Sequence, residues 1–367
     1  MTSRGTAPGA GSESPSGETA ATYAESGVDI AAGDRAVELM RPWVEKASRP
    51  EVIGGLGGFA GLFDLDPSRW RHPVLAASTD GVGTKLVIAQ ALGRHDTIGL
   101  DLVGMVVDDV VVCGAEPLFL QDYVACGRVV PERMAEIIGG VAEGCRQAGC
   151  ALVGGETAEH PGLLSQDEYD LAGTAVGVVE RDKLLGPDRV RAGDAVIALG
   201  SSGLHSNGYS LVRHVLLGPG RMHLDAIVDD LGSDRTLGEE LLTPTRIYAK
   251  DCLALIEEVD VHAFAHVTGG GLATNLSRVL PAHLDAVVER RTWRPQPIFD
   301  LIAGRGRVEP EEMERTFNMG AGMVAIVGRD DADRTLAVLI ARHLPAWGAG
   351  EIADGNGTAR LVGSYPS

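Results

Sequence analysis

The feature of this sequence that most constrains its fold is an alternation that begins after residue 70. A short apolar run ends at a loop that carries glycine or an acidic residue, and a helical pattern follows the loop. We expect strands at 73–79, 151–153, 171–179, 195–199, 285–288 and 323–327, the second of which stops at Gly154-Gly155-Glu156. We expect helices at 100–112, 209–217, 272–280 and 333–344, the first of them buried because it is apolar on nearly all sides. This alternation predicts an α/β or α+β fold with mixed sheets.

The length of 367 residues exceeds what one ordinary hydrophobic core supports, so we expect two domains. The turn-rich stretch 186–193 favours a boundary there, with an N-terminal domain at 23–185 and a C-terminal domain at 186–367. Residues 1–22 are dominated by small and polar residues and have no apolar h-region, so they predict a flexible tail and not a signal peptide. The apolar runs are too short to predict a membrane span.

The formal net charge of -19 argues against a nucleic-acid partner, because a polyanion needs a basic surface. It also means that a phosphate ligand must be held by local groups such as backbone N–H donors, metals and a few basic side chains. The five cysteines form no C-x-x-C pair, which favours reduced, mostly buried thiols in a cytoplasmic protein over zinc or redox chemistry.

Acidic residues form the first group of candidate site residues. Asp80 stands where a strand is expected to end, and Asp101, Asp108 and Asp109 lie on the apolar helix, the first two on one face. Buried carboxylates need compensation, and Mg²⁺ would supply it while it bridges to phosphate oxygens. Pairing with arginine, or a position at a solvated helix edge, is the alternative for any one of these acids. Together with Glu156 after its strand, Asp80 and Asp109 favour a magnesium site.

Glycine-rich loops form the second group. They lie at Gly54-Gly55-Leu56-Gly57-Gly58, at 200–203 and at 269–271, and two of them connect a strand to a helix. Such loops let backbone N–H groups approach an anion closely. None matches the P-loop or the dinucleotide fingerprint, and a single cluster of this kind is more often a simple turn. Three in one chain favour phosphate handling.

Two histidines lie beside these loops. His205 lies within the second loop region and His266 directly precedes Val267-Thr268-Gly269, so either could contact a phosphate or move a proton near neutral pH. A structural, hydrogen-bonded histidine is the alternative for each. Lys85 and Arg213 are candidate phosphate partners, and a solvated surface charge is the alternative for both.

Several motifs in a fixed order give the chain a recognisable pattern. They are Ser26-Gly27-Val28-Asp29-Ile30, Arg49-Pro50-Glu51-Val52 through Phe59, Ser78-Thr79-Asp80-Gly81-Val82-Gly83-Thr84-Lys85, His95-Asp96-Thr97-Ile98-Gly99, Gly114-Ala115-Glu116-Pro117, Gly154-Gly155-Glu156-Thr157-Ala158-Glu159, Ser201 through Gly208, and His266 through Gly271. From about Tyr23 to near the C-terminus the chain resembles the phosphoribosylformylglycinamidine cyclo-ligase family of purine biosynthesis.

The resemblance implies an N-terminal sheet that forms a barrel across a homodimer and a C-terminal α/β domain alongside, with ATP and formylglycinamidine ribonucleotide in the cleft between them. It implies Mg²⁺, with K⁺ as an activator. Matched residue by residue, it implies metal and ATP-side acids at Asp80, Asp109 and Glu156. It places Thr84, Lys85, Gly54, Gly55, Gly57 and Gly58 on the nucleotide side, and His205, Asn207 and His266 near the substrate.

The chain departs from the family pattern at Asp108, where relatives usually have Asn, and at Arg41, where many have a lysine. The alternatives within the wider superfamily are thiamine-monophosphate kinase, selenophosphate synthetase and the hydrogenase-maturation dehydratase. The last two depend on cysteines that this chain lacks at the corresponding positions, since it has none before Cys113 and ends in Gly363-Ser364-Tyr365-Pro366-Ser367. A nucleotide-binding regulator without catalysis is the alternative from another class.

Overall fold

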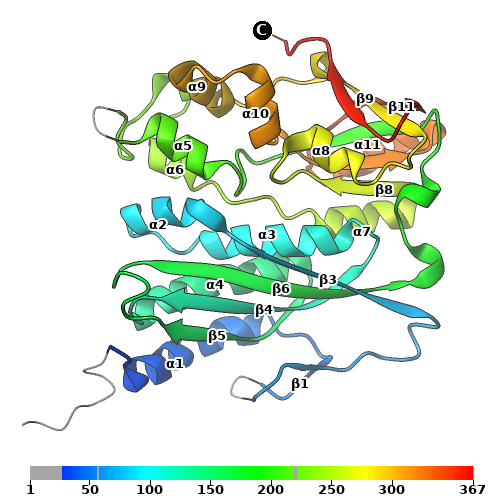
Figure 1. Ribbon diagram of the computed structural model, residues 1–367. Helices are drawn as coiled ribbons and strands as arrows, with labels where there is room; N and C mark the ends of the chain where they lie inside the picture. Colours follow the sequence, from blue (N-terminus) through cyan, green and yellow to red (C-terminus); the bar gives the residue numbers. More distant parts are fainter. Residues whose placement is uncertain (1–26, 56–57, 219–220, 367) are drawn as a thin grey trace, which may run out of the picture.

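The computed structural model describes residues 27–55, 58–218 and 221–366. Within these ranges the chain builds two separate sheets with helices packed around each (Figure 1). The expected tail at 1–22 lies outside the described residues, as does Gly57. The helices are α1 (Ile30–Lys46), α2 (Leu86–Leu92), α3 (Ile98–Val111), α4 (Pro131–Ala148), α5 (Tyr209–Leu216), α6 (Leu237–Leu241), α7 (Ala249–Glu258), α8 (Gly271–Ser277), α9 (Pro297–Gly306), α10 (Pro310–Thr316) and α11 (Ala332–Ala341).

The first sheet has four strands in the order β3-β6-β4-β5. They are β3 (Pro73–Gly81), β4 (Glu116–Cys126), β5 (Ala151–Glu159) and β6 (Tyr169–Glu180), while β1 (Val52–Ile53) and β2 (Leu62–Phe63) form a small hairpin. Strand β6 is antiparallel to both neighbours and β4 is parallel to β5, so the sheet is mixed as the sequence predicts. Figure 1 shows α3 and α4 on one face of this sheet. The opposite face exposes Leu75 and Tyr123 at 63% and 41%.

Helices α3 and α4 cross at glycines that allow their backbones to approach closely. A Cβ added at Gly99 would lie 2.1 Å from the backbone nitrogen of Val141, and one added at Gly140 would lie 2.5 Å from the carbonyl of Asp96. Helix α3 is buried over almost its whole surface, because its residues are apolar on nearly every side. The sequence therefore predicted α3 correctly, within two residues at its N-terminal end.

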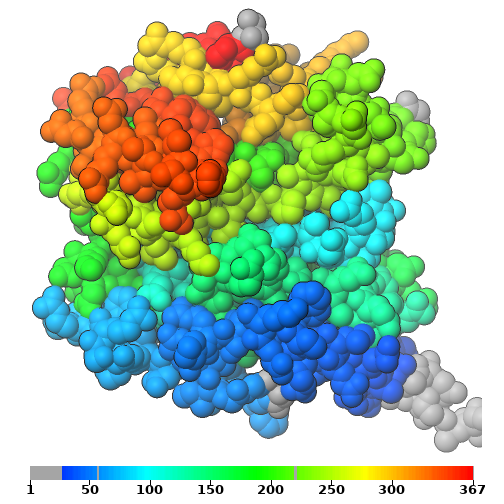
Figure 2. All heavy atoms as spheres, turned by 180° about the vertical axis from the view of Figure 1, so that it is seen from behind, coloured from blue at the N-terminus to red at the C-terminus, as the bar shows by residue number. Residues whose placement is uncertain are grey.

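The second sheet has six strands in the order β12-β9-β11-β7-β10-β8. They are β7 (Ala195–Gly200), β8 (Val261–His266), β9 (Leu284–Glu289), β10 (Ala321–Val327), β11 (Ala346–Asp354) and β12 (Ala359–Val362). All neighbours are antiparallel except β12 and β9, which run parallel. Figure 2, seen from behind, shows the half built by the C-terminal residues stacked on the half built by the N-terminal residues.

Most of the expected elements are confirmed, and one boundary was wrong. The strands expected at 73–79, 171–179, 195–199, 285–288 and 323–327 are present as β3, β6, β7, β9 and β10, and the four helices as α3, α5, α8 and α11. Strand β5 does not stop at Gly154 but continues to Glu159, because parallel pairing with β4 carries it through both glycines. The elements that were not expected are α1, α2, α4, α6, α7, α9, α10, β1, β2, β4, β8, β11 and β12.

Four of the five cysteines are buried, Cys113 is half-buried, and all five are free thiols, as the sequence indicates. In the part of the chain that the structure describes, none of the helices combines the length and apolarity that crossing a bilayer requires.

Candidate active site

A cavity of about 310 Å³ lies between the two halves of the molecule. From the first half, β3 contributes Ser78 and the end of α3 contributes Asp109. From the second half, β8 contributes His266, and the segment around α8 contributes Asn275 and Arg278. The remaining lining residues are Ala77, Val112, Phe264, Ala265 and Val279. Polar and ionisable groups from both sheets therefore converge on one cavity, which is the usual setting of an active site.

The central contact of this cavity joins Asp109 to His266. The Nδ1 atom of His266 lies 2.8 Å from Oδ1 of Asp109, and Ser78 Oγ donates to Oδ2 of the same carboxylate at 3.3 Å. A carboxylate only accepts hydrogen bonds, so Nδ1 carries a proton and Asp109 fixes the orientation of the imidazole. Burial alone would raise the pKa of Asp109, but the hydrogen bond and charge of His266 hold it below its usual range.

The second ring nitrogen of His266 is buried and has no hydrogen-bond partner among the described residues. Burial lowers the pKa of His266, but the hydrogen bond to Asp109 and the nearby charges of Asp108, Asp109 and Asp80 outweigh it, so the pKa is raised overall. An unpartnered buried Nε2 atom is costly unless a ligand or water occupies the space beside it. The cavity is therefore suited to a ligand that this nitrogen contacts.

Asp80 lies near this pair on the same side of β3. It is two residues after Ser78, so alternation along the strand directs both side chains to the face that α3 covers. One carboxylate oxygen of Asp80 accepts from the backbone nitrogen of Gly81 at 2.7 Å. Asp80 and Asp109 thus place carboxylate oxygens, the ligands that Mg²⁺ prefers, on one side of the cleft.

The buried acids Asp101 and Asp108 have a different role from the one that the sequence indicated. Asp101 Oδ1 accepts from the backbone nitrogen and the hydroxyl of Thr245, both at 2.7 Å, and Asp108 accepts from the backbone nitrogen of Tyr248 at 2.9 and 3.1 Å. Both carboxylates are fully buried, and neither pairs with an arginine within the described residues. Burial raises the pKa of Asp108 to about 7. Both acids fasten α3 to the segment that precedes α7 in the other half.

Lys85 lies inside the protein and not on the cleft surface that a nucleotide-side residue needs. Its side chain is fully buried, and Nζ donates to Asp101 at 2.7 Å, to the carbonyl of Thr243 at 2.7 Å and to the carbonyl of His205 at 3.2 Å. These three bonds use all the donors of an ammonium group. Nearby Thr84 is placed differently, because its hydroxyl lies 3.1 Å from that of Ser210 across the two halves.

His205 and Asn207 lie in the loop between β7 and α5. His205 is 1% exposed, has a positive φ of 61°, and its Nε2 accepts from the backbone nitrogen of Ser202 at 3.2 Å. Burial lowers the pKa of His205 well below its usual value, so the ring is neutral. Asn207 is half-buried beside Met105 and Gly269. Of the two histidines that the sequence left open, His266 is the one that lines the cavity.

The remaining predicted residues lie at the outer edge of the first sheet. Gly54 and Gly55 line a small cavity of about 160 Å³ with Arg41, and Gly58 and Glu156 line another of about 430 Å³ beside α1. The strand order places Glu156 three strands from Asp80, roughly 14 Å at the usual spacing. Across residues 27–55, 58–218 and 221–366 no cluster of three or more His, Cys, Asp or Glu side chains could hold a metal. Within one chain, Glu156 therefore does not join Asp80 and Asp109.

The cavity also contains residues that sequence reasoning missed. Arg278 directly follows α8, and its Nη1 donates to Asn275 Oδ1 at 3.3 Å. The Nδ2 atom of Asn275 donates to the carbonyls of Thr268, Gly269 and Gly271, so it holds the glycine loop in place. The spacing of three residues between Asn275 and Arg278 on the helix after a glycine loop was the signal available in the sequence.

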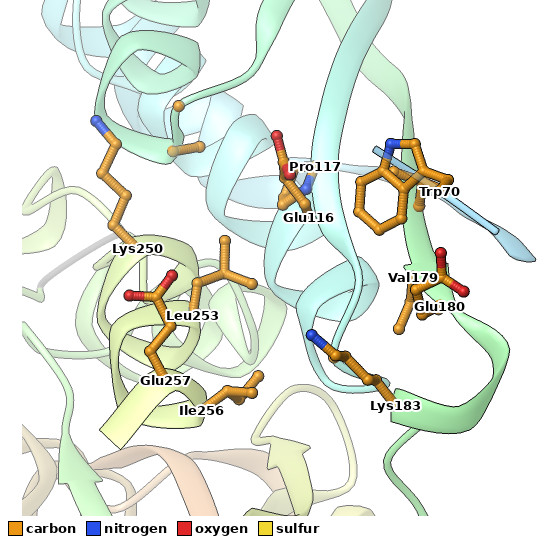
Figure 3. Close-up of a pocket in the computed structure, with 14 residues that line it drawn as sticks. Trp70, Glu116, Pro117, Val179, Glu180, Lys183, Lys250, Leu253, Ile256 and Glu257 are labelled. Carbon is orange, nitrogen blue, oxygen red and sulfur yellow. The ribbon is translucent and has the colours of Figure 1, made fainter. Parts of the chain in front are cut away.

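A second interdomain cavity, of about 420 Å³, contains none of the predicted site residues among those that line it. Figure 3 shows Trp70, Glu116 and Lys183 on one side and the α7 residues Leu253 and Glu257 on the other. Its charges are mixed and no histidine lines it. The cavity around Asp109 and His266 is therefore the candidate active site.

The fold and the site define an AIR synthase related protein. The N-terminal domain model of that group matches residues 62–179, and the C-terminal domain model matches residues 191–363. Among solved structures, a thiamine-monophosphate kinase from Stenotrophomonas maltophilia shares the fold with a TM-score of 0.64 at 21% identity, covering 90% of this chain and 97% of that one. The hydrogenase maturation protein HypE in complex with ATP has a TM-score of 0.63 at 19% identity, covering 90% of this chain and 91% of that one.

Within this group, sequence identity is much higher to one family. A phosphoribosylformylglycinamidine cyclo-ligase from Myxococcus xanthus is 53% identical, covering 93% of this chain and 98% of the relative. One from Anaeromyxobacter dehalogenans (strain 2CP-1) is 56% identical, covering 91% and 96%. One from Geobacillus kaustophilus is 52% identical, covering 93% and 98%. The chain belongs to the phosphoribosylformylglycinamidine cyclo-ligase family and is an enzyme.

Proposed function

We propose that this enzyme closes the imidazole ring of 5-aminoimidazole ribonucleotide from formylglycinamidine ribonucleotide, with conversion of ATP to ADP and phosphate, as a ligase of purine biosynthesis. Family membership at more than half identity supports the reaction. The observation that supports its location is the Asp109–His266 contact, which joins the two halves of the molecule in one cavity.

The reaction must overcome the poor leaving ability of an amide oxygen. The formyl oxygen attacks the γ-phosphorus of ATP, ADP leaves, and an iminophosphate forms. The amidine nitrogen then attacks the activated carbon, and the C–O bond breaks as inorganic phosphate departs. The enzyme contributes mainly positioning and charge stabilisation.

In this scheme His266 accepts the proton that the attacking nitrogen loses. Its Nδ1–H is held by Asp109, so the lone pair of the neutral ring lies on Nε2, the atom that has no partner among the described residues. His205 acts indirectly. Its backbone carbonyl accepts from Lys85 and its ring stays buried, so it fixes the loop that carries Asn207 near the substrate.

Mg²⁺ fits the residues of this cleft. Asp80 and Asp109 supply two carboxylates, and Mg²⁺ is commonly bound by one or two carboxylates together with substrate phosphates. Bound there, Mg²⁺ would neutralise phosphate charge during transfer. The expectation of K⁺ as an activator rests on the family resemblance alone.

The proposed assembly is a homodimer in the cytoplasm, with domains at 23–185 and 186–367 after a tail at 1–22. One chain forms an open four-stranded sheet and not a closed barrel, and its uncovered face exposes Leu75 and Tyr123. Two such faces packed together would form the barrel that the resemblance implies. In one chain, Glu156 and the loop with Gly54, Gly55 and Gly58 lie far from Asp80. In such a dimer they would lie near the cleft of the partner chain.

A coupled assay tests the function. The enzyme is incubated with ATP, Mg²⁺, K⁺ and formylglycinamidine ribonucleotide, and phosphate and diazotised aminoimidazole are quantified separately. Equal yields of the two products, with little phosphate when the ribonucleotide is omitted, are expected. Phosphate without aminoimidazole would refute the cyclo-ligase proposal, and a phosphorylated ribonucleotide that accumulates would indicate a kinase.

A further inference from the structure

Arg278 lines the active-site cavity with an exposed side chain and has no acidic partner among the described residues. Its one hydrogen bond within the described residues is that from Nη1 to Asn275 Oδ1, and it forms no ion pair there. Arg278 lies close enough to Asp109 for its charge to help lower the pKa of that carboxyl. Both oxygens of Asp109 already accept from His266 and Ser78. The guanidinium therefore keeps several N–H donors free at the cavity.

The position of Arg278 is fixed by the loop that follows β8. Asn275 is buried and holds three backbone carbonyls of that loop, and the same side chain accepts from Arg278. This anchoring reduces the conformational freedom that a long side chain loses when it binds a ligand. Arg278 lines the same cavity as His266, whose Nε2 is buried and unpartnered in the described part of the chain.

What distinguishes Arg278 from other unpaired arginines of the described chain is its place. It lines the cavity that also contains His266, whose Nε2 is buried and has no partner among the described residues. At a formal net charge of -19, an anionic ligand needs such a local cation. The planar guanidinium matches phosphoryl oxygens with two parallel hydrogen bonds.

We propose that Arg278, which lines the cavity beside His266, forms a phosphoryl subsite and binds a phosphoryl group of the substrates directly. This proposal rests on the proposed function, because that function requires two phosphoryl groups at the cleft. One is the γ-phosphoryl group that moves to the amide oxygen, and the other is the 5′-phosphate of the ribonucleotide.

Steady-state kinetics of Arg278→Gln and Arg278→Lys test the subsite. Arg305→Gln is the matched control, because Arg305 is 57% exposed on α9 and lies away from the cavity. Arg278→Gln should lose about 10- to 100-fold in kcat/KM, the usual range for hydrogen bonds to a charged group. Arg278→Lys should lose less kcat/KM, because lysine keeps the charge but not the planar pair of N–H donors. The kcat/KM of Arg305→Gln should stay within about twofold of wild type.

A comparison of the ribonucleotide with its ribonucleoside identifies which phosphoryl group Arg278 binds. If Arg278 holds the transferred group, the loss falls in kcat and is the same with formylglycinamidine ribonucleoside, which lacks the 5′-phosphate. If Arg278 holds the 5′-phosphate, the loss falls in KM for the ribonucleotide and is absent with the ribonucleoside. An Arg278→Gln enzyme with both parameters within about twofold of the Arg305→Gln control overturns the subsite.

Binding measurements separate this inference from the proposed function. Titration calorimetry with inorganic phosphate and with the ribonucleotide requires no turnover. Even if the wild-type enzyme forms no aminoimidazole, weaker binding of either ligand to Arg278→Gln than to Arg305→Gln supports the subsite. Equal binding of both ligands by the two variants overturns it.

Discussion

Replacing Lys85 with methionine tests the most deeply buried charge pair in the described chain. Lys85 and Asp101 are both fully buried, and Nζ lies 2.7 Å from Oδ1. Methionine fills a similar volume but removes the charge, so a buried carboxylate loses its cation and the carbonyls of Thr243 and His205 lose a donor. Removal of one partner of a buried pair typically costs about 3–5 kcal/mol. That is a large part of the roughly 5–15 kcal/mol that stabilises a folded protein.

The double variant separates charge from packing. Asp101→Asn keeps an oxygen that can accept from Thr245 but removes the charge, so Lys85→Met together with Asp101→Asn has no unpaired ion. We expect the double variant to lose roughly 1–3 kcal/mol, less than Lys85→Met alone and well below the sum of the single losses. Lys183→Met, at an exposed lysine, should change stability by about 0.5 kcal/mol or less.

Urea denaturation, followed by both fluorescence and circular dichroism, provides the assay, because coincident transitions justify a two-state free energy. The reasoning is refuted if Lys85→Met loses less than about 1 kcal/mol relative to the Lys183→Met control. It is also refuted if the two single losses simply add in the double variant, because additivity would mean that the two groups do not interact.

Three further predictions concern the site. His266→Gln should lower kcat by about 10²–10⁴-fold while phosphate and aminoimidazole stay equal, and a loss confined to KM would argue against a role in proton transfer. Asp108 keeps its proton up to about pH 7 in the folded state but only to about 3.8 when unfolded, so its contribution to stability is full below pH 4 and falls as the pH rises through 7. Asp108→Asn should therefore raise Tm above that of wild type, and this rise should be at least about 2 °C larger at pH 8 than at pH 5. A rise in Tm that is the same at both pH values would contradict this. If the cleft is completed across a homodimer, Asp109→Asn and Glu156→Gln chains that are unfolded, mixed and refolded together should recover about a quarter of wild-type activity. Half of the random dimers are then heterodimers, and each of these has one intact site of its two. No recovery in heterodimers isolated with two affinity tags would show that each cleft uses its own Glu156.

The sequence allowed the elements with a strong apolar pattern to be predicted, and glycine accounts for two of the failures, at α4 and β5. Helix α3 has no competing pattern, so its prediction needed no tertiary information. Helix α4 contains Gly139, Gly140 and Gly144, which are typical of loops, yet close packing on α3 and Trp43 requires them. Strand β5 continues through Gly155, and glycine is required at this position because a side chain there would collide with Asp122.

The site was predictable as separate residues but not as contacts. Asp80 and His266 lie in sequence motifs and Asp109 lies on the apolar helix, but no local pattern indicates that Asp109 meets a histidine 157 positions away. Lys85 is the opposite case: a basic residue after a glycine-rich strand end predicted a phosphate ligand, and the structure surrounds its ammonium group with protein acceptors. Its burial depends on Asp101 and on the carbonyls of a distant segment, which become neighbours only when the two halves pack.

Helix α3 explains why its three acids have separate roles. Asp101 and Asp108 are seven residues apart, so they lie on nearly the same side of the helix, where they accept the backbone N–H groups of Thr245 and Tyr248. Asp109 is one step of about 100° further round, which turns it toward β3 and His266. Because the same rigid helix carries the fastening residues and the reactive one, any slip of the second half along α3 would also move His266 away from Asp109. Fastening α3 at Asp101 and Asp108 therefore sets the geometry of the cavity that lies at its C-terminal end.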